Sequence, residues 1–383
     1  MARDSTQSAV ARKFLLRVAV VTVATLMPLA AIEIGLRAYG YEAFRWSDRV
    51  NPQLLTATGN DALPYVLTPN AAGRGWDTDV VVNSHGFRDR EFTESNENHA
   101  LRVVALGDSI TFGSRIADPD VLYPKRLEHL LRRHRISRNA QVLNFGVTGY
   151  DVLNDVELLR VRALRFHPDI VVIGLCVNDI GYSSTAMTYV TAQRYVGHPI
   201  FRLRVAQFVL GSVLRILTSS QSREDETVQS FARINRSHIA PVEHDGELLD
   251  AMDRLTKERP ARHEQDVVRW WTELPRIGYL EYAFGKLRDL GRESGFAVVV
   301  APVPLLDDTR VDEWRIVNEI IRHESLKFGF HVIDLSGPFE AAGLRRLRNH
   351  PADFIHPGPR GHAIIAQALD EYLYSAGLLV HSP

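Results

Sequence analysis

Apolar and polar positions change along the chain in blocks, and these blocks predict a parallel sheet flanked by helices. Short apolar runs, most of them rich in β-branched residues, occur at 102–106, 141–145, 170–175, 296–301 and 331–335. Stretches with helix-like spacing lie near 120–135, 151–166, 276–294, 312–328 and 360–376. Continuous apolar strands that alternate with helices are typical of a parallel sheet covered on both faces. We therefore expect an α/β fold of three layers with five parallel strands.

One stretch interrupts this alternation. Residues from about 180 to 275 separate the third and fourth strands by far more than an ordinary crossover, so we interpret them as an insertion. Within it, residues 199–217 form an amphipathic pattern with three arginines. Such a helix rests on a membrane surface or packs over the sheet as a lid, and packing is the commoner outcome.

The amino terminus carries the longest apolar run, at residues 14–36. About 20 mainly apolar residues suffice to span a bilayer as a helix. The uninterrupted core, 18–32, is 15 residues long. We therefore predict a single transmembrane helix of marginal length.

The charges beside this run predict its orientation. Four cationic residues lie on its amino side: Arg3, Arg12, Lys13 and Arg17. Cationic flanks stay in the cytoplasm, so residues 1–13 are expected there and the remainder outside it. A cleaved signal peptide is the alternative. Because Pro28 and Leu29 spoil a clean small-residue cleavage site before position 31, we favour an uncleaved signal anchor.

Residues 37–100 look like an irregular lead-in to a domain that occupies 101–383. The stretch 79–92 contains a short β-rich run and then a turn signal at His85-Gly86. We interpret it as an edge strand and turn packed against the domain. This interpretation is preferred over a binding role for Arg88 or Asp89.

Charge and cysteine content exclude some classes of function. The formal net charge is -1, which leaves no basic footprint for a nucleic-acid partner. The only cysteine is Cys176, so an intramolecular disulfide is excluded. Since Cys176 lies inside an apolar run, we expect a buried, inert thiol rather than a nucleophile.

Polar residues with catalytic potential follow the predicted strands. The groups are Gly107-Asp108-Ser109 after the first strand, Gly146 and Gly149 after the second, Asn178-Asp179 after the third, and Asp353 with His356 after the last. The carboxyl ends of parallel strands meet at one edge of a sheet. These groups are therefore expected to converge.

Their chemistry fits together. A serine hydroxyl needs a base to remove its proton, and a carboxylate holds a neutral imidazole in the tautomer that acts as this base. Asp353 and His356 are three residues apart, so a turn can bring them together. A glycine N–H and an asparagine amide can donate to a developing oxyanion.

The blocks "GDSIT", "NFGVTG", "VND" and "DFIHP" resemble those of the SGNH (GDSL-type) hydrolases. In that family the blocks occur in this order on a flavodoxin-like sheet. The resemblance covers residues 101–182 and 296–376. Any one block alone is a weak signal, whereas four in order at strand ends are a strong one.

The resemblance implies a role for each matching residue. Ser109 resembles the family's nucleophile, whose backbone N–H also donates to the oxyanion. His356 resembles the family's general base, and Asp353 resembles the acid that orients this base. Gly149 and Asn178 resemble the remaining oxyanion donors, with Gly146 as the weaker alternative to Gly149. The family's third block usually reads G-x-N-D, whereas this chain has Cys176 in place of the glycine.

Three further polar residues near these blocks are expected to be structural. We interpret His362 as a buried residue at a helix start, and Asp108 and Asp179 as braces for loops. His356 and His362 have no convincing third ligand beside them, so we predict neither a metal nor another cofactor.

Together these features predict a membrane-anchored, extracytoplasmic serine esterase that acts on O-acetyl groups of carbohydrate or on lipid esters. An O-acyltransferase acting on envelope polysaccharide would use the same residues. A catalytically silent module that binds a glycan or a partner is a third possibility, against which the complete set of residues argues.

Overall fold

The structure, a computed structural model, describes residues 2–39, 54–60, 62–134, 137–177, 179–180, 200, 203–209, 276–309 and 311–379. The chain divides into two units, each described by itself. One unit comprises residues 1–48 and 191–223, and the other comprises 49–190 and 224–383.

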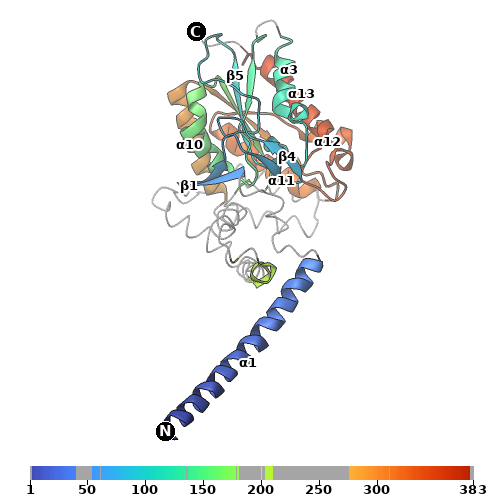
Figure 1. The fold of residues 1–383 in the computed structure, drawn as a ribbon. Coiled ribbons are helices and arrows are strands. Elements are labelled where there is room, and N and C mark those ends of the chain that lie inside the picture. The colour runs from blue at the N-terminus through green and yellow to red at the C-terminus, as the bar shows by residue number, and fades with distance from the viewer. Residues whose placement is uncertain are drawn as a thin grey trace. The chain divides into compact units, whose positions relative to one another are not determined.

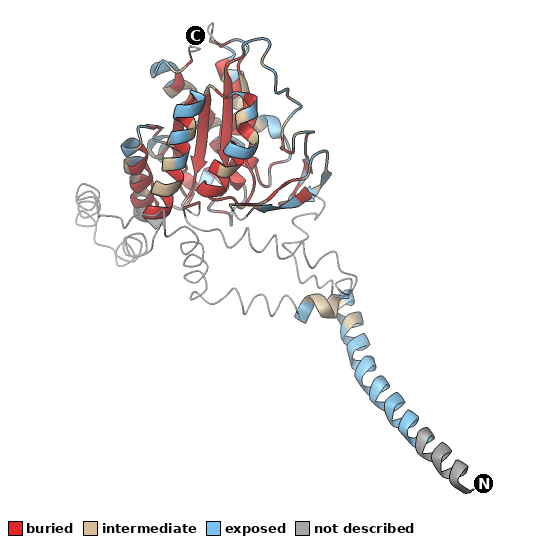
Figure 2. Cartoon of the chain, turned by 90° about the vertical axis from the view of Figure 1, so that its left-hand side faces the viewer, coloured by how far each residue is buried: buried red, intermediate tan, exposed pale blue. Residues whose placement is uncertain are grey.

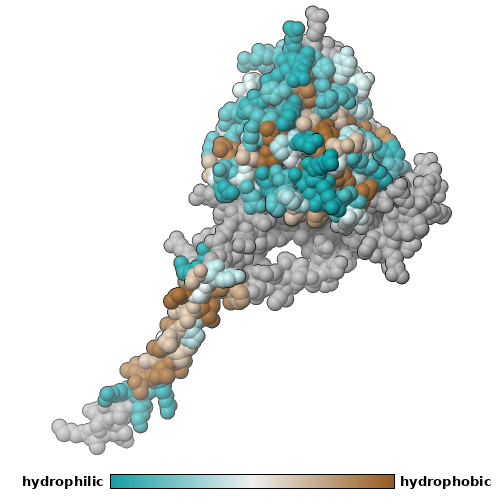
Figure 3. Space-filling view, turned by 90° about the vertical axis from the view of Figure 1, so that its right-hand side faces the viewer, coloured by the Kyte–Doolittle hydropathy of each residue, from teal (hydrophilic) through white to brown (hydrophobic). Residues whose placement is uncertain are grey.

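In the first unit, helix α1 spans Ala2–Ala38 and includes the predicted membrane segment. Its stretch Arg12–Ala38 is long and apolar enough to cross a membrane. Apolar side chains along this stretch are exposed, and Figure 3 shows them as a mainly brown band. Length and composition of this kind fit both an anchor and a signal sequence.

Most of the expected insertion lies outside the described residues. Residues 204–209, within the predicted helix 199–217, are helical. The N–H of Val205 donates to the Glu33 carboxylate of α1 at 2.8 Å. Whether the complete helix is a lid or lies on a membrane stays a prediction.

The second unit is built on a five-stranded sheet in the order β6-β5-β7-β8-β9 (Figure 1). The strands are β5 (Arg102–Gly107), β6 (Gln141–Asn144), β7 (Ile170–Leu175), β8 (Ala297–Pro302) and β9 (His331–Val332). Every pairing is parallel. In chain order this sheet reads 2-1-3-4-5, the flavodoxin-like arrangement. The predicted fold class is confirmed, although the last strand is shorter than expected.

Helices cover both faces of this sheet, as the alternation predicted. One face packs against α3 (Tyr123–Leu131), α12 (Ser336–Ala342) and α13 (Pro359–Ser375). The other packs against α4 (Val152–Leu158), α10 (Arg276–Ser294) and α11 (Val311–Lys327). All six residues of β5 and of β7 are buried between these layers, which explains the apolar runs from Val103 in β5 and throughout β7 (Figure 2).

The helical segments differ from the predicted ones at one helix end and in several short segments. The stretch 151–166 is an α-helix only to Leu158, and continues as a π turn over Leu159–Ala163 and a 3-10 turn over Leu164–Phe166. Three further short helical segments are η2 (Pro119–Val121), η6 (Leu344–Leu347) and α12. The sequence pattern predicted neither η6 nor α12, because segments this short carry little periodicity, whereas η2 overlaps the start of the predicted stretch 120–135.

A strand is found within the predicted β-rich run, at Thr78–Val81, but the expectation of an irregular lead-in is wrong for residues 55–81. They form two antiparallel hairpins, β1 (Leu55–Asn60) with β2 (Leu63–Leu67) and β3 (Ala72–Gly75) with β4 (Thr78–Val81). Neither hairpin joins the parallel sheet. The β-rich run pairs locally because Trp76 and Asp77 both adopt positive φ, the geometry of a tight two-residue hairpin turn.

The residues after the hairpins pack into the unit as the sequence analysis expected. The buried Asp89 carboxylate pairs with Lys125 of α3 at 2.7 Å and accepts from the Asn144 N–H at 2.8 Å. Burial raises the pKa of Asp89 more than the Lys125 charge lowers it. Arg88 is also buried, and its guanidinium donates to the backbone carbonyls of Phe112 and Gly113.

Candidate active site

Ser109 lies at the carboxyl end of β5, where the chain turns into the short helix α2 (Ser109–Phe112). β5 is flanked by β6 and β7, so this is the point at which the strand order reverses and open α/β sheets bind ligands. Asp108 caps α2, because its carboxylate accepts from the Ile110 N–H at 2.9 Å. Ser109 is the first residue of the helix, and its N–H therefore has no acceptor within the helix.

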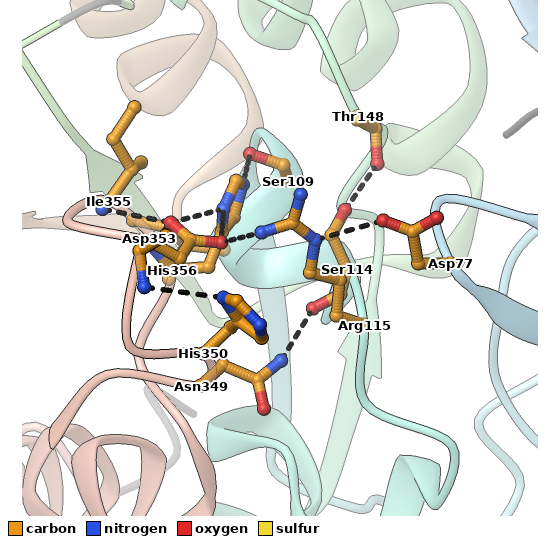
Figure 4. A network of polar contacts seen from close by, with 12 residues as sticks. Asp77, Ser109, Ser114, Arg115, Thr148, Asn349, His350, Asp353, Ile355 and His356 are labelled. Carbon is orange, nitrogen blue, oxygen red and sulfur yellow. Dashed lines mark hydrogen bonds and ion pairs between the residues drawn. The ribbon is translucent and has the colours of Figure 1, made fainter. Parts of the chain in front are cut away.

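His356 and Asp353 reach the same place from the loop that precedes α13. The loop is closed by bonds from the Asn349 N–H to the His356 carbonyl, at 3.0 Å, and from the Gly358 N–H to the Leu347 carbonyl, at 2.7 Å. The His356 ring lies between the Ser109 hydroxyl and the Asp353 carboxylate (Figure 4). Nε2 is 2.9 Å from Ser109 Oγ, and Nδ1 is 2.8 Å from Asp353 Oδ2.

The Asp353 carboxylate is buried and accepts several hydrogen bonds. Besides the His356 ring, the N–H groups of Ile355 and His356 each donate to Oδ1 at 3.0 Å. Burial raises the pKa of Asp353, but the hydrogen bonds from the His356 side chain and backbone and from Ile355 outweigh it, and the pKa lies well below its usual range. Asp353 is therefore ionised near neutral pH.

The Ser109 hydroxyl has two acceptors for its single hydrogen. Asp108 Oδ2, the carboxylate oxygen that takes no part in the cap bond, lies 2.8 Å from Oγ. His356 Nε2 lies 2.9 Å from Oγ. Only the arrangement in which Ser109 donates to His356 prepares the hydroxyl for deprotonation. Asp108 was expected to brace a loop; in the structure its carboxylate caps α2 and also contacts the Ser109 hydroxyl.

The two candidate glycines after β6 differ in what surrounds them. A Cβ on Gly146 would lie 2.3 Å from the Phe112 backbone nitrogen, so Gly146 permits close packing against α2. Its N–H already donates to Asn144 Oδ1 at 3.0 Å. Gly149 has φ +83 in the turn that the Tyr150 N–H closes onto the Val147 carbonyl, a position that favours glycine. Of the two, Gly149 is the better candidate for an oxyanion donor.

Two hydrogen bonds connect the Gly149 turn to neighbouring elements. The Thr148 hydroxyl lies 3.1 Å from the Ser114 hydroxyl in the loop after α2. The Tyr65 hydroxyl of β2 donates to the Thr148 carbonyl at 2.6 Å. The first hairpin therefore helps to hold the turn near Ser109.

Asn178 lies outside the described residues, so its predicted role stays a prediction. Its neighbour Asp179 is described and is buried. The Asp179 carboxylate accepts from the Cys176 N–H at 2.6 Å, and its carbonyl accepts from the Val152 N–H at 2.9 Å. Burial, followed by the charge of Asp108, raises the pKa of Asp179 well above its usual value. Asp179 thus braces this loop, and Cys176 is buried as expected.

His362 of α13 is buried beside the site, as the sequence analysis expected. Its Nδ1 accepts from the Tyr123 N–H at 3.1 Å, and the two rings stack. Burial, and then the positive charges of Arg126, His356 and Arg88, lowers the pKa of His362 to about 3. His362 is therefore neutral at physiological pH and serves as a hydrogen-bond acceptor.

This lowered pKa predicts a pH dependence of stability. Between pH 6.5 and 3 the unfolded chain binds a proton at position 362 and the folded chain does not, so falling pH favours unfolding by up to about 1.4 kcal/mol per pH unit. His362→Asn keeps a side-chain acceptor for the Tyr123 N–H but cannot ionise. Urea unfolding should therefore show that the free energy of unfolding falls less between pH 7 and pH 4.5 for His362→Asn than for wild type. The exposed His129 of α3 offers a matched control, and equal losses in all three proteins would contradict the assignment.

Two residues that the sequence analysis did not single out complete the polar network. Arg115 contacts the Asp353 carboxylate, and it also pairs with Asp77 of the β3–β4 turn at 3.1 Å (Figure 4). Arg115 lies six residues after Ser109 and Asp77 lies in the lead-in, so no strand-end pattern indicates either. Across the described ranges, no group of three or more His, Cys, Asp or Glu residues is arranged to hold a metal ion.

Comparisons with known proteins bear on this site. The family model described as "GDSL-like Lipase/Acylhydrolase family" matches residues 105–364. A comparison with curated proteins found no match. Among solved structures, the chain is similar to LAE5, an alpha/beta hydrolase enzyme from the metagenome of Lake Arreo, Spain, with 15% identity over 73% of this chain and 96% of that chain and a TM-score of 0.40. It is also similar to Axe2, an acetylxylan esterase from Geobacillus stearothermophilus, with 14% identity, coverage of 74% and 97%, and a TM-score of 0.38.

Proposed function

Because the chain belongs to the GDSL-like lipase/acylhydrolase family, and is thus an SGNH-type hydrolase, we propose that it is a membrane-anchored serine esterase whose hydrolase domain lies outside the cytoplasm. The observation that carries the proposal is the continuous contact from Asp353 through His356 to Ser109. Nδ1 is 2.8 Å from Asp353 Oδ2 and Nε2 is 2.9 Å from Ser109 Oγ. These separations suit proton transfer without rearrangement.

In the proposed reaction Ser109 Oγ attacks the acyl carbon of an ester. His356 Nε2 takes the hydroxyl proton as the bond forms, and then gives it to the departing alcohol. Asp353 stays ionised, holds Nδ1 protonated and stabilises the imidazolium that forms. Water, deprotonated by His356 in turn, then attacks the acyl-enzyme, releases the acid and restores Ser109.

The tetrahedral intermediate needs donors aimed at its oxyanion. We assign this role to the N–H groups of Ser109 and Gly149 and to the Asn178 side chain. The Ser109 N–H is at the start of α2, where helix geometry leaves it without an intrahelical acceptor. Gly149 is favoured over Gly146 because the Gly146 N–H is engaged by Asn144. One such donor contributes about 2.7–4 kcal/mol to transition-state stabilisation.

The location rests on the amino terminus. We propose that residues 1–13 are cytoplasmic, that 14–36 span the membrane as an uncleaved signal anchor, and that 37–100 lead into the hydrolase domain, 101–383, on the far side. The cationic residues before the apolar run support this orientation. Membranes washed with alkaline carbonate should then retain a protein with its amino terminus intact. A shortened protein in the soluble fraction would instead establish a cleaved signal peptide.

The substrates proposed are O-acetyl groups of carbohydrate or acyl groups of lipids. A surface-facing, membrane-anchored enzyme meets both. Hydrolysis of p-nitrophenyl acetate, butyrate and octanoate by the full-length protein in detergent micelles separates them. Preference for acetate indicates the carbohydrate esters, and preference for octanoate indicates the lipids.

Covalent labelling tests the mechanism directly. A fluorophosphonate should form an adduct on Ser109, located by mass spectrometry, and none on Ser114, five residues later in the loop after α2. Folded protein that is neither labelled nor active would contradict the proposal and favour a silent binding module. Labelled protein that transfers acetyl groups to an added sugar faster than to water would be an acyltransferase.

A further inference from the structure

The Arg115 guanidinium lies between two carboxylates. Its Nη1 contacts Asp353 Oδ2, the same oxygen that accepts from His356 Nδ1. Its Nε donates to Asp77 Oδ2 at 3.1 Å. The side chains of Asp353, Arg115 and Asp77 are 6%, 29% and 45% exposed. The bridge therefore runs from a turn at the surface to the buried acid beside His356 (Figure 4).

The backbone fixes Arg115 in this position. Arg115 has φ +64, a conformation that residues other than glycine adopt only where surrounding contacts impose it. Its N–H donates to the carbonyl of Trp76, the other residue of the β3–β4 turn, at 3.0 Å. The Trp76 ring packs edge-on against Phe112 of α2, with centroids 4.6 Å apart. The hairpin turn is thus docked against the segment that carries Ser109.

The bond from Arg115 bears on the orientation of Asp353. The two backbone N–H groups of Ile355 and His356 fix only Oδ1. Arg115 supplies the donor that fixes Oδ2, the oxygen nearest His356 Nδ1. A carboxylate held at both oxygens cannot turn about its Cβ–Cγ bond, so it presents a fixed acceptor to the imidazole.

We propose that Arg115 is a positioning residue for Asp353, and that the β3–β4 turn, through Asp77, is a part of the active site. The inference rests on the proposed function, because it concerns the acid of that same Ser-His-Asp arrangement. The turn lies outside residues 105–364, the part that matches the family. This chain therefore supports its catalytic acid with an element from its own lead-in.

Arg115 is expected to affect the orientation of the Asp353 carboxylate more than the stability of the fold. A partly exposed ion pair adds little to folding free energy, so the Arg115–Asp77 contact should act mainly on the reaction. Misplacement of a catalytic group by about 1 Å costs on the order of 100-fold in rate. Because Arg115 is proposed to act on Asp353 and not on the substrate, its loss should lower kcat and leave KM nearly unchanged.

The kinetic test compares four variants of the full-length protein with p-nitrophenyl acetate as substrate. Arg115→Ala should lower kcat by about 10- to 100-fold with KM within about threefold of wild type. Arg115→Lys keeps one donor for Asp353 and should recover most of the loss. Asp77→Asn suits the positive φ of the turn but removes its charge, and should cost only about two- to fivefold, since Arg115 keeps Asp353. Arg322→Ala removes an arginine that pairs with Glu319 within α11, and serves as the matched control.

A second readout does not depend on turnover. The proton on His356 Nδ1, hydrogen-bonded to Asp353, should give a far-downfield NMR signal in wild type. It should persist in Ser109→Ala and Arg322→Ala and should shift or broaden in Arg115→Ala, with partial return in Arg115→Lys. If wild type is inactive while these signals behave as stated, the proposed function fails and the positioning role stands. Unchanged kcat and an unchanged signal in folded Arg115→Ala would overturn the inference, as would a rise in KM alone, which would make Arg115 a substrate ligand.

Discussion

Replacing Ser109 with alanine is expected to lower kcat for p-nitrophenyl acetate by about 10⁴- to 10⁶-fold, because the proposed mechanism forms the acyl-enzyme on the Ser109 hydroxyl. His356→Ala should cost about as much, since the Ser109 hydroxyl is a poor nucleophile without the base 2.9 Å away. KM should change little in either variant, because both side chains act on the chemical step of the proposed mechanism. Steady-state kinetics on the full-length protein gives both parameters.

The double variant makes this prediction sharper. Residues that act as one unit lose their effect together, so Ser109→Ala with His356→Ala should be no slower than either single variant by more than about tenfold. Ser325→Ala is the matched control, because Ser325 is also a buried serine but only donates to the Ile321 carbonyl within α11. Losses that multiply in the double variant would show that Ser109 and His356 act in separate steps.

The sheet and its catalytic edge could be predicted because each rests on a local signal. β5 and β7 are buried on both faces, so every position except Arg102 at the start of β5 is apolar or small and the run is visible in the sequence. Parallel strands place their carboxyl ends at one edge, so residues after β5 and before α13 were expected to meet there. The structure brings Ser109, His356 and Asp353 together as expected.

The lead-in could not be predicted in the same way. Its second hairpin, β3–β4, depends on positive φ at both Trp76 and Asp77, and neither central residue of this turn is a glycine that would mark it in the sequence. Arg115 has the same feature and was overlooked for the same reason. These conformations are imposed by tertiary contacts, which a local pattern does not contain.

Two buried arginines also connect the lead-in to the rest of the unit. From the sequence alone, an arginine is expected to be a charged residue at the surface. The buried Arg102 of β5 donates to the carbonyls of Thr93, Glu94 and Ser95, at 2.9, 2.7 and 2.6 Å. Arg88, in the lead-in itself, reaches in the other direction to the loop after α2. The Arg88 guanidinium donates in particular to the carbonyls of the buried residues Phe112 and Ile116. The lead-in is therefore an integral part of the hydrolase unit.

Replacing Arg88 with methionine is expected to reduce the free energy of unfolding by about 3–5 kcal/mol, because each buried carbonyl left without a donor costs about 1–3 kcal/mol. The guanidinium donates to the carbonyls of Phe112, Gly113, Ile116 and Ala117, the segment that follows Ser109. Burial lowers the pKa of Arg88 to about 10, although the charge of Asp118 opposes it, so the side chain stays cationic at neutral pH. Urea unfolding followed by tryptophan fluorescence measures the change.

Two further variants show how much of the lost unfolding free energy comes from the hydrogen bonds to the carbonyls and how much from the charge or packing of the side chain. Arg88→Lys keeps the charge but cannot reach four carbonyls from one point, so it should recover only part of the loss. Arg160→Met removes an exposed arginine that pairs with Glu157, and should cost less than about 1 kcal/mol. If Arg88→Met also costs less than this, the carbonyls must find other donors, and the lead-in is dispensable to the loop. If the loss is large and kcat falls with it, the lead-in is needed to hold the segment that presents Ser109.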